Sequence, residues 1–170
     1  MNSAAKGFCV LDTSTTSQDF LPHERFLKVV ESTPLVSIDL VVLNEGKVLL
    51  GERLNRPAQG FWFVPGGRVR KFESLDQAYQ RISLSELGKV LFYAQSQLLG
   101  VYEHFYSDSV FGETPGTHYV AIGQFVELSE PLKSLPKDQH GNFAWWSLQR
   151  AMEAHDVHPY TKDYLRSLVE

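Results

Sequence analysis

Several features that restrict a protein's class are scarce or missing in this chain. It has one cysteine, Cys9, so an internal disulfide is excluded and a reducing compartment is favoured. No apolar run approaches the roughly 20 residues that cross a bilayer. The segment before Asp12 holds too little apolar sequence for a secretory signal. We therefore expect a cytoplasmic protein with no membrane partner and an inert Cys9 thiol.

The chain also lacks an excess of positive charge. Its 16 lysines and arginines face 20 acidic residues, which gives a net charge of -4. No global basic field is present to hold nucleic acid, so any phosphate must be bound by local arginines. The 170 residues suit one globular domain, which we place at 21–170. Residues 1–20 are rich in serine and threonine, and we expect them to form a flexible tail.

Strand-like segments outnumber helix-like segments along the chain. Ser37 and Asp39 alternate with apolar residues, which predicts a strand at 35–43 with one polar edge. Turn residues at 44–46 then predict a hairpin to a strand at 47–53. Further strands are expected at 61–64, 98–106, 117–126 and 143–147, and helices at 23–31, 74–88, 148–154 and 160–169. The sequence therefore predicts an α+β fold with a mixed sheet covered by a few helices.

The most informative stretch runs from Gly66 to Gly88 and reads GGRVRKFESLDQAYQRISLSELG. Ser74 and Gln77 have the spacing of a capping box, and Gly88 is a suitable C-terminal stop, so a helix is predicted between them. Glu86 falls on the apolar face of that helix. A buried carboxylate needs an arginine, several hydrogen bonds or a metal. The alternative is a glutamate at a helix end that simply reaches solvent.

Basic residues gather beside the Gly-Gly turn. Arg68, Arg70 and Lys71 lie in the following loop, and Arg81 lies in the helix. Guanidinium groups bind phosphate oxygens in a forked geometry, and glycine lets the backbone approach closely. A phosphate-binding loop is one interpretation. The other is that these are solvated loop residues.

These residues resemble a Nudix box, whose pattern is G-x(5)-E-x(7)-R-E-U-x-E-E-x-G-U. The positions in register are Gly67, Glu73, Arg81, Glu86 and Gly88. The sequence departs from the pattern at Ile82 and Ser85, which replace glutamates, and at Ser83 and Lys89, which replace aliphatic residues. The resemblance implies a Nudix α/β/α sandwich with a mixed β-sheet.

The altered box resembles one branch in particular, the GDP-mannose mannosyl hydrolases, which are GDP-sugar glycosidases. The segments STPLVSIDLVVLNEGKVLLGERLNRPAQGFWFVPGGRV, GVYEHFY, THYV and DQH also resemble that branch. The resemblance implies a homodimer that hydrolyses GDP-mannose or GDP-glucose to GDP and free hexose. Water would attack the anomeric carbon with inversion. The cofactor would be magnesium, with manganese as an alternative.

The resemblance also implies roles for single residues. Magnesium would be held by the Gly66 carbonyl, Glu86 and the Gln139 side chain, because one retained box carboxylate suits a single ion. Arg53, with Arg68 and Arg81 nearby, would stabilise the charge that grows on the β-phosphate of GDP. The general base would be His140, which on residue type alone is equally a solvated turn residue.

Asp39 and Tyr119 correspond to residues that contact the sugar or the diphosphate. The alternatives are an edge-strand aspartate and a core tyrosine. Glu73 is expected to pair with Arg81, Trp62 to pack in the core, and His104 and His118 to be structural. No signal attaches to His23, His155 or His158. Two other functions stay open, which are ordinary Nudix cleavage at phosphorus and a non-catalytic nucleotide-sugar sensor.

Overall fold

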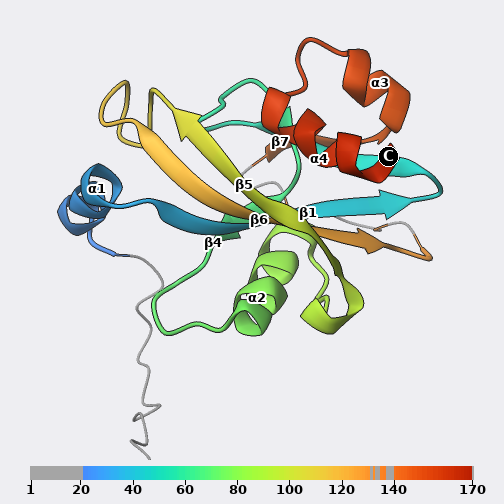
Figure 1. The fold of residues 1–170 in the computed structure, drawn as a ribbon, viewed down its shortest axis with the longest axis horizontal. Coiled ribbons are helices and arrows are strands. Elements are labelled where there is room, and N and C mark those ends of the chain that lie inside the picture. The colour runs from blue at the N-terminus through green and yellow to red at the C-terminus, as the bar shows by residue number, and fades with distance from the viewer. Residues whose placement is uncertain (1–20, 131, 133–134, 137–139, 170) are drawn as a thin grey trace, which may run out of the picture.

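One mixed sheet with helices on both faces forms the body of the protein (Figure 1). The computed structural model describes residues 21–130, 132, 135–136 and 140–169, with the backbone alone for residues 140 and 169. Helix α2 (Leu75–Leu87) covers one face of the sheet, and α3 (Leu148–Glu153) and α4 (Pro159–Val169) cover the other. The predicted α+β sandwich is confirmed. The predicted tail at 1–20 and the predicted metal ligand Gln139 lie outside the described residues.

The strands follow the order β3-β2-β1-β6-β5, with β4 paired to β1 and β7 paired to β2. Their bounds are β1 (Leu35–Asn44), β2 (Lys47–Arg53), β3 (Trp62–Phe63), β4 (Gly66–Arg68), β5 (Gln97–Tyr106), β6 (Thr117–Glu127) and β7 (His140–Ser147). The β1–β6 pair is parallel, and the other pairs are antiparallel. The sheet is therefore mixed, as the sequence predicts.

Strand β1 changes partner along its length. It pairs with β2 only at Leu43–Val48 and Asn44–Lys47, at the hairpin turn. Residues 37–39 pair instead with β4. The two strands of the hairpin therefore separate, and the short Gly-Gly strand takes the place beside the first half of β1.

The prediction of a polar edge on this strand is wrong. Ser37 and Asp39 are only 5% and 6% exposed. Nearly the whole of β1 pairs with β6 along one edge. Along its other edge, β1 pairs with β4 at residues 37–39. Asp39 therefore lies in the middle of the sheet, where a polar group needs specific partners.

Alternate residues of β1 pack in two separate hydrophobic cores, one on each face of the sheet. Ile38, Leu40 and Val42 pack in the cluster that contains Tyr79 and Ile82 of α2. On the opposite face the cluster contains Val41, Leu43, Val48, Leu50, Phe63, Tyr164 and Leu165. The period of two explains the division, since successive strand side chains point to opposite faces. Each large apolar side chain contributes about 1.5–3 kcal/mol by leaving water.

Most element boundaries agree with the sequence to within a residue or two, including α1 (His23–Ser32), which ends before Pro34. The aromatic strand is shorter than predicted, and β7 begins three residues earlier, at His140 rather than Phe143. Strand β4 and the short 3-10 helix at Tyr93–Gln95 are not predicted. No helix in the described part of the chain is long and apolar enough to span a bilayer.

Candidate active site

A cleft of about 300 Å³ opens where β1 leaves β2 and meets β4. Helix α1 supplies part of one rim through Phe26, and α2 supplies the wall that carries Glu86. The predicted site residues that line the cleft are Asp39, Arg53, Gly66, Arg68, Arg81, Glu86 and Tyr119. Residues from five separate elements therefore meet at one place, as the resemblance implies.

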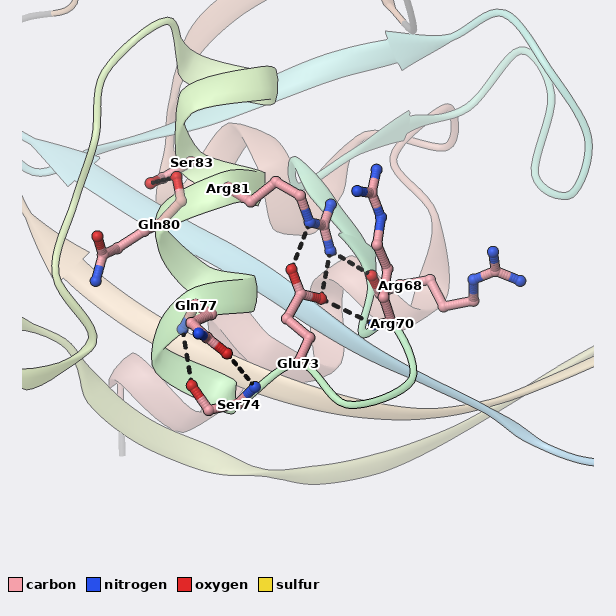
Figure 2. Close-up of polar contacts among 8 residues, drawn as sticks. All are labelled: Arg68, Arg70, Glu73, Ser74, Gln77, Gln80, Arg81 and Ser83. Carbon is pink, nitrogen blue, oxygen red and sulfur yellow. Dashed lines mark hydrogen bonds and ion pairs between the residues drawn. The ribbon is translucent and has the colours of Figure 1, made fainter. Parts of the chain in front are cut away.

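The start and end of α2 follow from local chemistry. Ser74 Oγ accepts from the Gln77 amide at 3.2 Å, and Gln77 Oε1 accepts from the Ser74 amide at 2.9 Å (Figure 2). Gly88 ends the helix in the left-handed conformation, with φ of 67°. The predicted capping box and C-cap are confirmed. They fix which turns of the helix carry Arg81 and Glu86 to the cleft.

Arg81 and Glu73 brace the loop before the helix. Arg81 Nε donates to Glu73 Oε1 at 2.6 Å, and Nη2 donates to Glu73 Oε2 and to the Arg68 carbonyl, both at 2.8 Å (Figure 2). Glu73 also accepts from the Arg70 amide. Burial alone would raise the pKa of Glu73, but these bonds outweigh it and lower the pKa. The predicted pairing is confirmed, and the contacts make Arg81 a brace for the loop.

Gly66 brings the backbone of β4 unusually close to β1. A Cβ there would lie 2.7 Å from Asp39 Oδ1 and 2.8 Å from the Ile38 carbonyl oxygen, so only glycine fits. The ladder bonds run from Leu40 N to Pro65 O and from Val69 N to Val36 O. Antiparallel alternation therefore makes Asp39 and Gly66 a non-hydrogen-bonded pair, and the Gly66 carbonyl faces away from β1.

Oxygen donors suited to a hard divalent cation lie along this part of the cleft. Glu86 is buried, with 4% exposure, and lines the cleft together with Gly66. Carboxylate and carbonyl oxygens are the ligands that magnesium prefers. Among the described residues, no group of three or more His, Cys, Asp or Glu is placed to hold a metal. The Glu86 carboxylate and the Gly66 carbonyl supply two oxygens, which fits a magnesium ion that takes one or two protein ligands.

The altered box positions differ in where they point. Ile82 is 1% exposed and belongs to the core on the α2 side, where a Cβ on Gly67 would lie 3.1 Å from Ile82 Cγ1. Ser83 is fully buried, and its Oγ donates to Gln80 O and accepts from Leu91 N at 2.9 Å. Ser85 is exposed and lines the cleft. Ile82 and Ser83 are thus buried, and Ile82 also lines the cleft together with the exposed Ser85.

The arginines make the cleft attractive to anions. Arg53 ends β2, and its Nε donates to the Pro57 carbonyl at 2.8 Å. The Arg68 guanidinium carbon lies 4.1 Å from the centre of the Phe26 ring, a cation–π contact. Burial, and then the neighbouring Arg70 and Arg81 charges, lower the pKa of Arg68, while Tyr119 opposes them. These cations suit a ligand with two phosphates.

Asp39 is a second buried carboxylate of the cleft, besides Glu86. Burial raises its pKa to about 6, although a hydrogen bond from Tyr164 and the Arg53 charge both lower it. The Tyr164 hydroxyl donates to Asp39 Oδ2 at 2.7 Å. His104 is also buried, and burial followed by the nearby His158 lowers its pKa to about 4. At neutral pH the imidazole of His104 is therefore uncharged.

Two aromatic residues that the sequence did not single out pack against the residues that line the cleft near Asp39. His158 packs against Phe63 and Tyr106, and Tyr160 stacks on His104 with ring centres 4.1 Å apart. His158 and Tyr160 lie in the C-terminal region, far from the box in sequence. No local motif marks them, and only their aromatic type was available as a signal. His104 is 3% exposed and lines the cleft, where its Nδ1 lies 4.0 Å from Asp39 Oδ2.

The backbone of the predicted base, His140, begins β7 opposite Arg53 of β2. The pairing brings that position to the end of β2, where Arg53 enters the cleft. The side chain of His140 lies outside the described part of the structure. Its role as the base therefore stays a prediction.

Comparisons with known proteins give a consistent result. The family model described as NUDIX domain matches residues 33–168. The low-salt glycan biosynthesis protein Agl8 of Haloferax volcanii is 40% identical over 149 residues, which cover 87% of this chain and 90% of that protein. The crystal structure of a MutT NUDIX hydrolase from Burkholderia pseudomallei superposes with a TM-score of 0.68 and 25% identity, and the match covers 81% of this chain and 99% of that one. The NUDIX domain of Shewanella oneidensis NrtR, solved with ADP ribose, has a TM-score of 0.63 and 19% identity, over 88% of this chain and 97% of that one.

Proposed function

This chain belongs to the Nudix family of hydrolases, and on that premise we propose that it hydrolyses GDP-mannose or GDP-glucose to GDP and free hexose. The observation that carries the proposal is the content of the cleft. Arginines surround a site where Glu86 is the single retained glutamate of the paired box positions. The likeness to a protein named for glycan biosynthesis supports a nucleotide sugar as the substrate class.

The protein ligands of a magnesium ion would be the Gly66 carbonyl, Glu86 and the Gln139 side chain. When bound, the ion would neutralise charge on the diphosphate and so make GDP a better leaving group. Manganese would use the same oxygen ligands. The placement of Gly66 and Glu86 at one cleft supports this proposal.

The arginines favour loss of GDP from the sugar. As the bond between the anomeric carbon and the β-phosphate oxygen breaks, negative charge grows on that oxygen. Arg53 and Arg68 lie in the cleft to stabilise it, and Arg81 holds the backbone of Arg68 in place. A carboxylic acid that protonates the leaving oxygen, as in most glycosidases, then becomes unnecessary.

Water completes the reaction from the opposite face of the sugar. His140 would accept one proton as the water oxygen bonds to the anomeric carbon, and the electron pair of the broken bond would leave with GDP. The anomeric configuration would be inverted. Asp39 and Tyr119 would contact the sugar or the diphosphate from the floor of the cleft.

Hydrolysis in oxygen-18 water separates this reaction from its nearest rival. Attack at carbon places the label on the hexose, which is the expected result. Label on GMP or on a sugar phosphate would instead establish ordinary Nudix cleavage at phosphorus and overturn the proposal. Binding of GDP-mannose without any turnover would support a sensor.

Replacement of the proposed base gives an independent test. His140→Gln should lower kcat by about 10²–10⁴-fold while the substrate still binds. His155→Gln, at an exposed position away from the cleft, is the matched control and should keep wild-type activity. Equal activity in both variants would remove His140 as the base. We further propose a homodimer, which sedimentation equilibrium would test by its mass.

A further inference from the structure

The C-terminal helix reaches the floor of the cleft through one side chain. The Tyr164 hydroxyl on α4 donates to Asp39 Oδ2 on β1 at 2.7 Å. Tyr164 is fully buried, and Asp39 is 6% exposed. A buried hydrogen bond to a carboxylate is stronger than a neutral one and costs more to remove. The contact therefore fixes the position of the Asp39 carboxylate.

A glycine on the sheet makes this reach possible. A Cβ at Gly123 of β6 would lie 2.9 Å from Tyr164 Cε1, closer than real side chains approach. The Tyr102 ring meets the Tyr164 ring edge to face, with centres 4.6 Å apart. The ring of Tyr164 is thus held against the sheet from two sides. Its hydroxyl has little freedom to leave Asp39.

The two oxygens of Asp39 have different surroundings. Oδ2 accepts from Tyr164, whereas Oδ1 is the atom that a Cβ on Gly66 would meet first. Oδ1 is therefore turned toward β4, whose residue Gly66 lines the cleft. An ionised carboxylate oxygen can only accept, so its ligand partner must be a donor such as a hydroxyl.

His104 adds a further contact to the pair. Its Nε2 lies 3.3 Å from the Tyr164 hydroxyl, and its Nδ1 lies 4.0 Å from Asp39 Oδ2. The ring is stacked on Tyr160 with an interplanar angle of 4°. A neutral His104 with its proton on Nε2 can donate to Tyr164, whose own proton is directed to Asp39. The three groups then form one chain of hydrogen bonds that ends at the cleft.

We propose that Tyr164 is a positioning residue for sugar recognition, which holds Asp39 Oδ2 so that Oδ1 accepts a hydrogen bond from a hexose hydroxyl. The proposal rests on the proposed function, because it needs a nucleotide sugar as the ligand. Tyr164 acts through Asp39. It should therefore affect binding of the sugar and leave binding of the nucleoside diphosphate unchanged.

Titration calorimetry in EDTA tests this, because GDP-mannose and GDP share the nucleoside diphosphate and only GDP-mannose carries the hexose. Tyr164→Phe should weaken binding of GDP-mannose by about tenfold and change binding of GDP by less than about twofold. In an Asp39→Asn background the same replacement should add less than about threefold, since the two side chains act together. Equal weakening of both ligands, or additive effects of the two replacements, would overturn the proposal.

Tyr102→Phe is the matched control for the loss of one tyrosine hydroxyl. Its hydroxyl pairs with Ser167 Oγ at 2.9 Å and does not line the cleft. If Tyr164→Phe fails to fold, Gly123→Ala is the second variant. Its new Cβ should displace the Tyr164 ring and give the same selective loss, and unchanged GDP-mannose binding in that variant would overturn the proposal.

The outcomes also separate this inference from the proposed reaction. Wild-type affinity of Tyr164→Phe for both GDP-mannose and GDP would overturn the inference, whatever bond the enzyme cleaves. Oxygen-18 label on phosphorus together with a selective effect of Tyr164→Phe would overturn only the reaction.

Discussion

Arg81 and Glu73 are joined by two hydrogen bonds, from Arg81 Nε to Glu73 Oε1 at 2.6 Å and from Nη2 to Oε2 at 2.8 Å. The pair ties the middle of α2 to the loop that precedes it. Arg81 Nη2 also donates to the carbonyl of Arg68. The pair therefore holds the backbone of Arg68, which we propose to bind phosphate.

Replacement of Arg81 by lysine should therefore weaken both stability and turnover. Lysine cannot reproduce the forked contact, and we expect the free energy of unfolding in urea to fall by about 1–2 kcal/mol. kcat should fall as well, because Arg68 loses its backbone support. Arg166→Lys is the control, since its partner Asp163 is on the exposed side of α4 and should change stability by less than about 0.5 kcal/mol. Equal effects of the two replacements would contradict the bracing role.

The pH dependence of stability should reveal Glu73. Its pKa in the folded protein is below the ordinary value of 4.5, so its contribution is fully present above pH 4.5 and is lost as pH falls through the folded pKa. Urea unfolding between pH 7 and pH 3 should therefore show a smaller loss of stability in Glu73→Gln than in wild type. Glu103→Gln, on an exposed position of β5, should follow the wild-type curve.

Asp39 should change the stability of the protein with pH in the direction opposite to Glu73. Burial raises its folded pKa from 3.8 to about 6. The stability that protonated Asp39 contributes is therefore fully present below pH 3.8 and is lost as pH rises through 6. The difference corresponds to about 3 kcal/mol as an upper limit. In EDTA, the stability of Asp39→Asn relative to wild type should rise by up to this amount between pH 4 and 7.5. If the stability of the two proteins depended on pH in the same way, burial would not raise the pKa of Asp39.

Metal binding should respond to one altered box position and not to the other. Ser85→Glu places a second carboxylate on the cleft and should tighten Mn²⁺ binding, measured by electron paramagnetic resonance of the free ion. Glu86→Gln should abolish binding. Ile82→Glu should give no stable second metal ligand and should destabilise the protein by about 2–5 kcal/mol, because Ile82, although it also lines the cleft, is 1% exposed and packs in the core beside α2. Tighter Mn²⁺ binding by a stable Ile82→Glu protein would contradict this assignment of the two positions.

What the sequence could predict was mainly local. The capping box at Ser74 and Gln77, the C-cap at Gly88 and the pairing of Glu73 with Arg81 each join residues that are near in the chain. Their chemistry can be recognised without knowledge of the sheet. The hairpin from β1 to β2 follows in the same way from its turn residues.

The surroundings of Asp39 could not be predicted, because they come from distant segments. Its hydrogen-bond partner Tyr164 is 125 positions away, and β4, which covers its other side, consists of three residues with little strand propensity. Alternation alone cannot tell a central strand from an edge strand. The sequence also gives no measure of which box replacements are buried. In the structure Ile82 is 1% exposed and Ser85 is exposed, although both line the cleft.

The contact of Asp39 with Tyr164 has a consequence for how the site forms during synthesis of the chain. The strands in the described part of the chain all precede α4, so their residues are synthesised before Tyr164. Until then Asp39 has no hydroxyl from α4, and the core on the α4 side of the sheet lacks Tyr164 and Leu165. Non-local contacts of this kind form late because loop closure must precede them. A chain that ends before α4 therefore lacks the hydroxyl that holds Asp39 Oδ2 at the cleft.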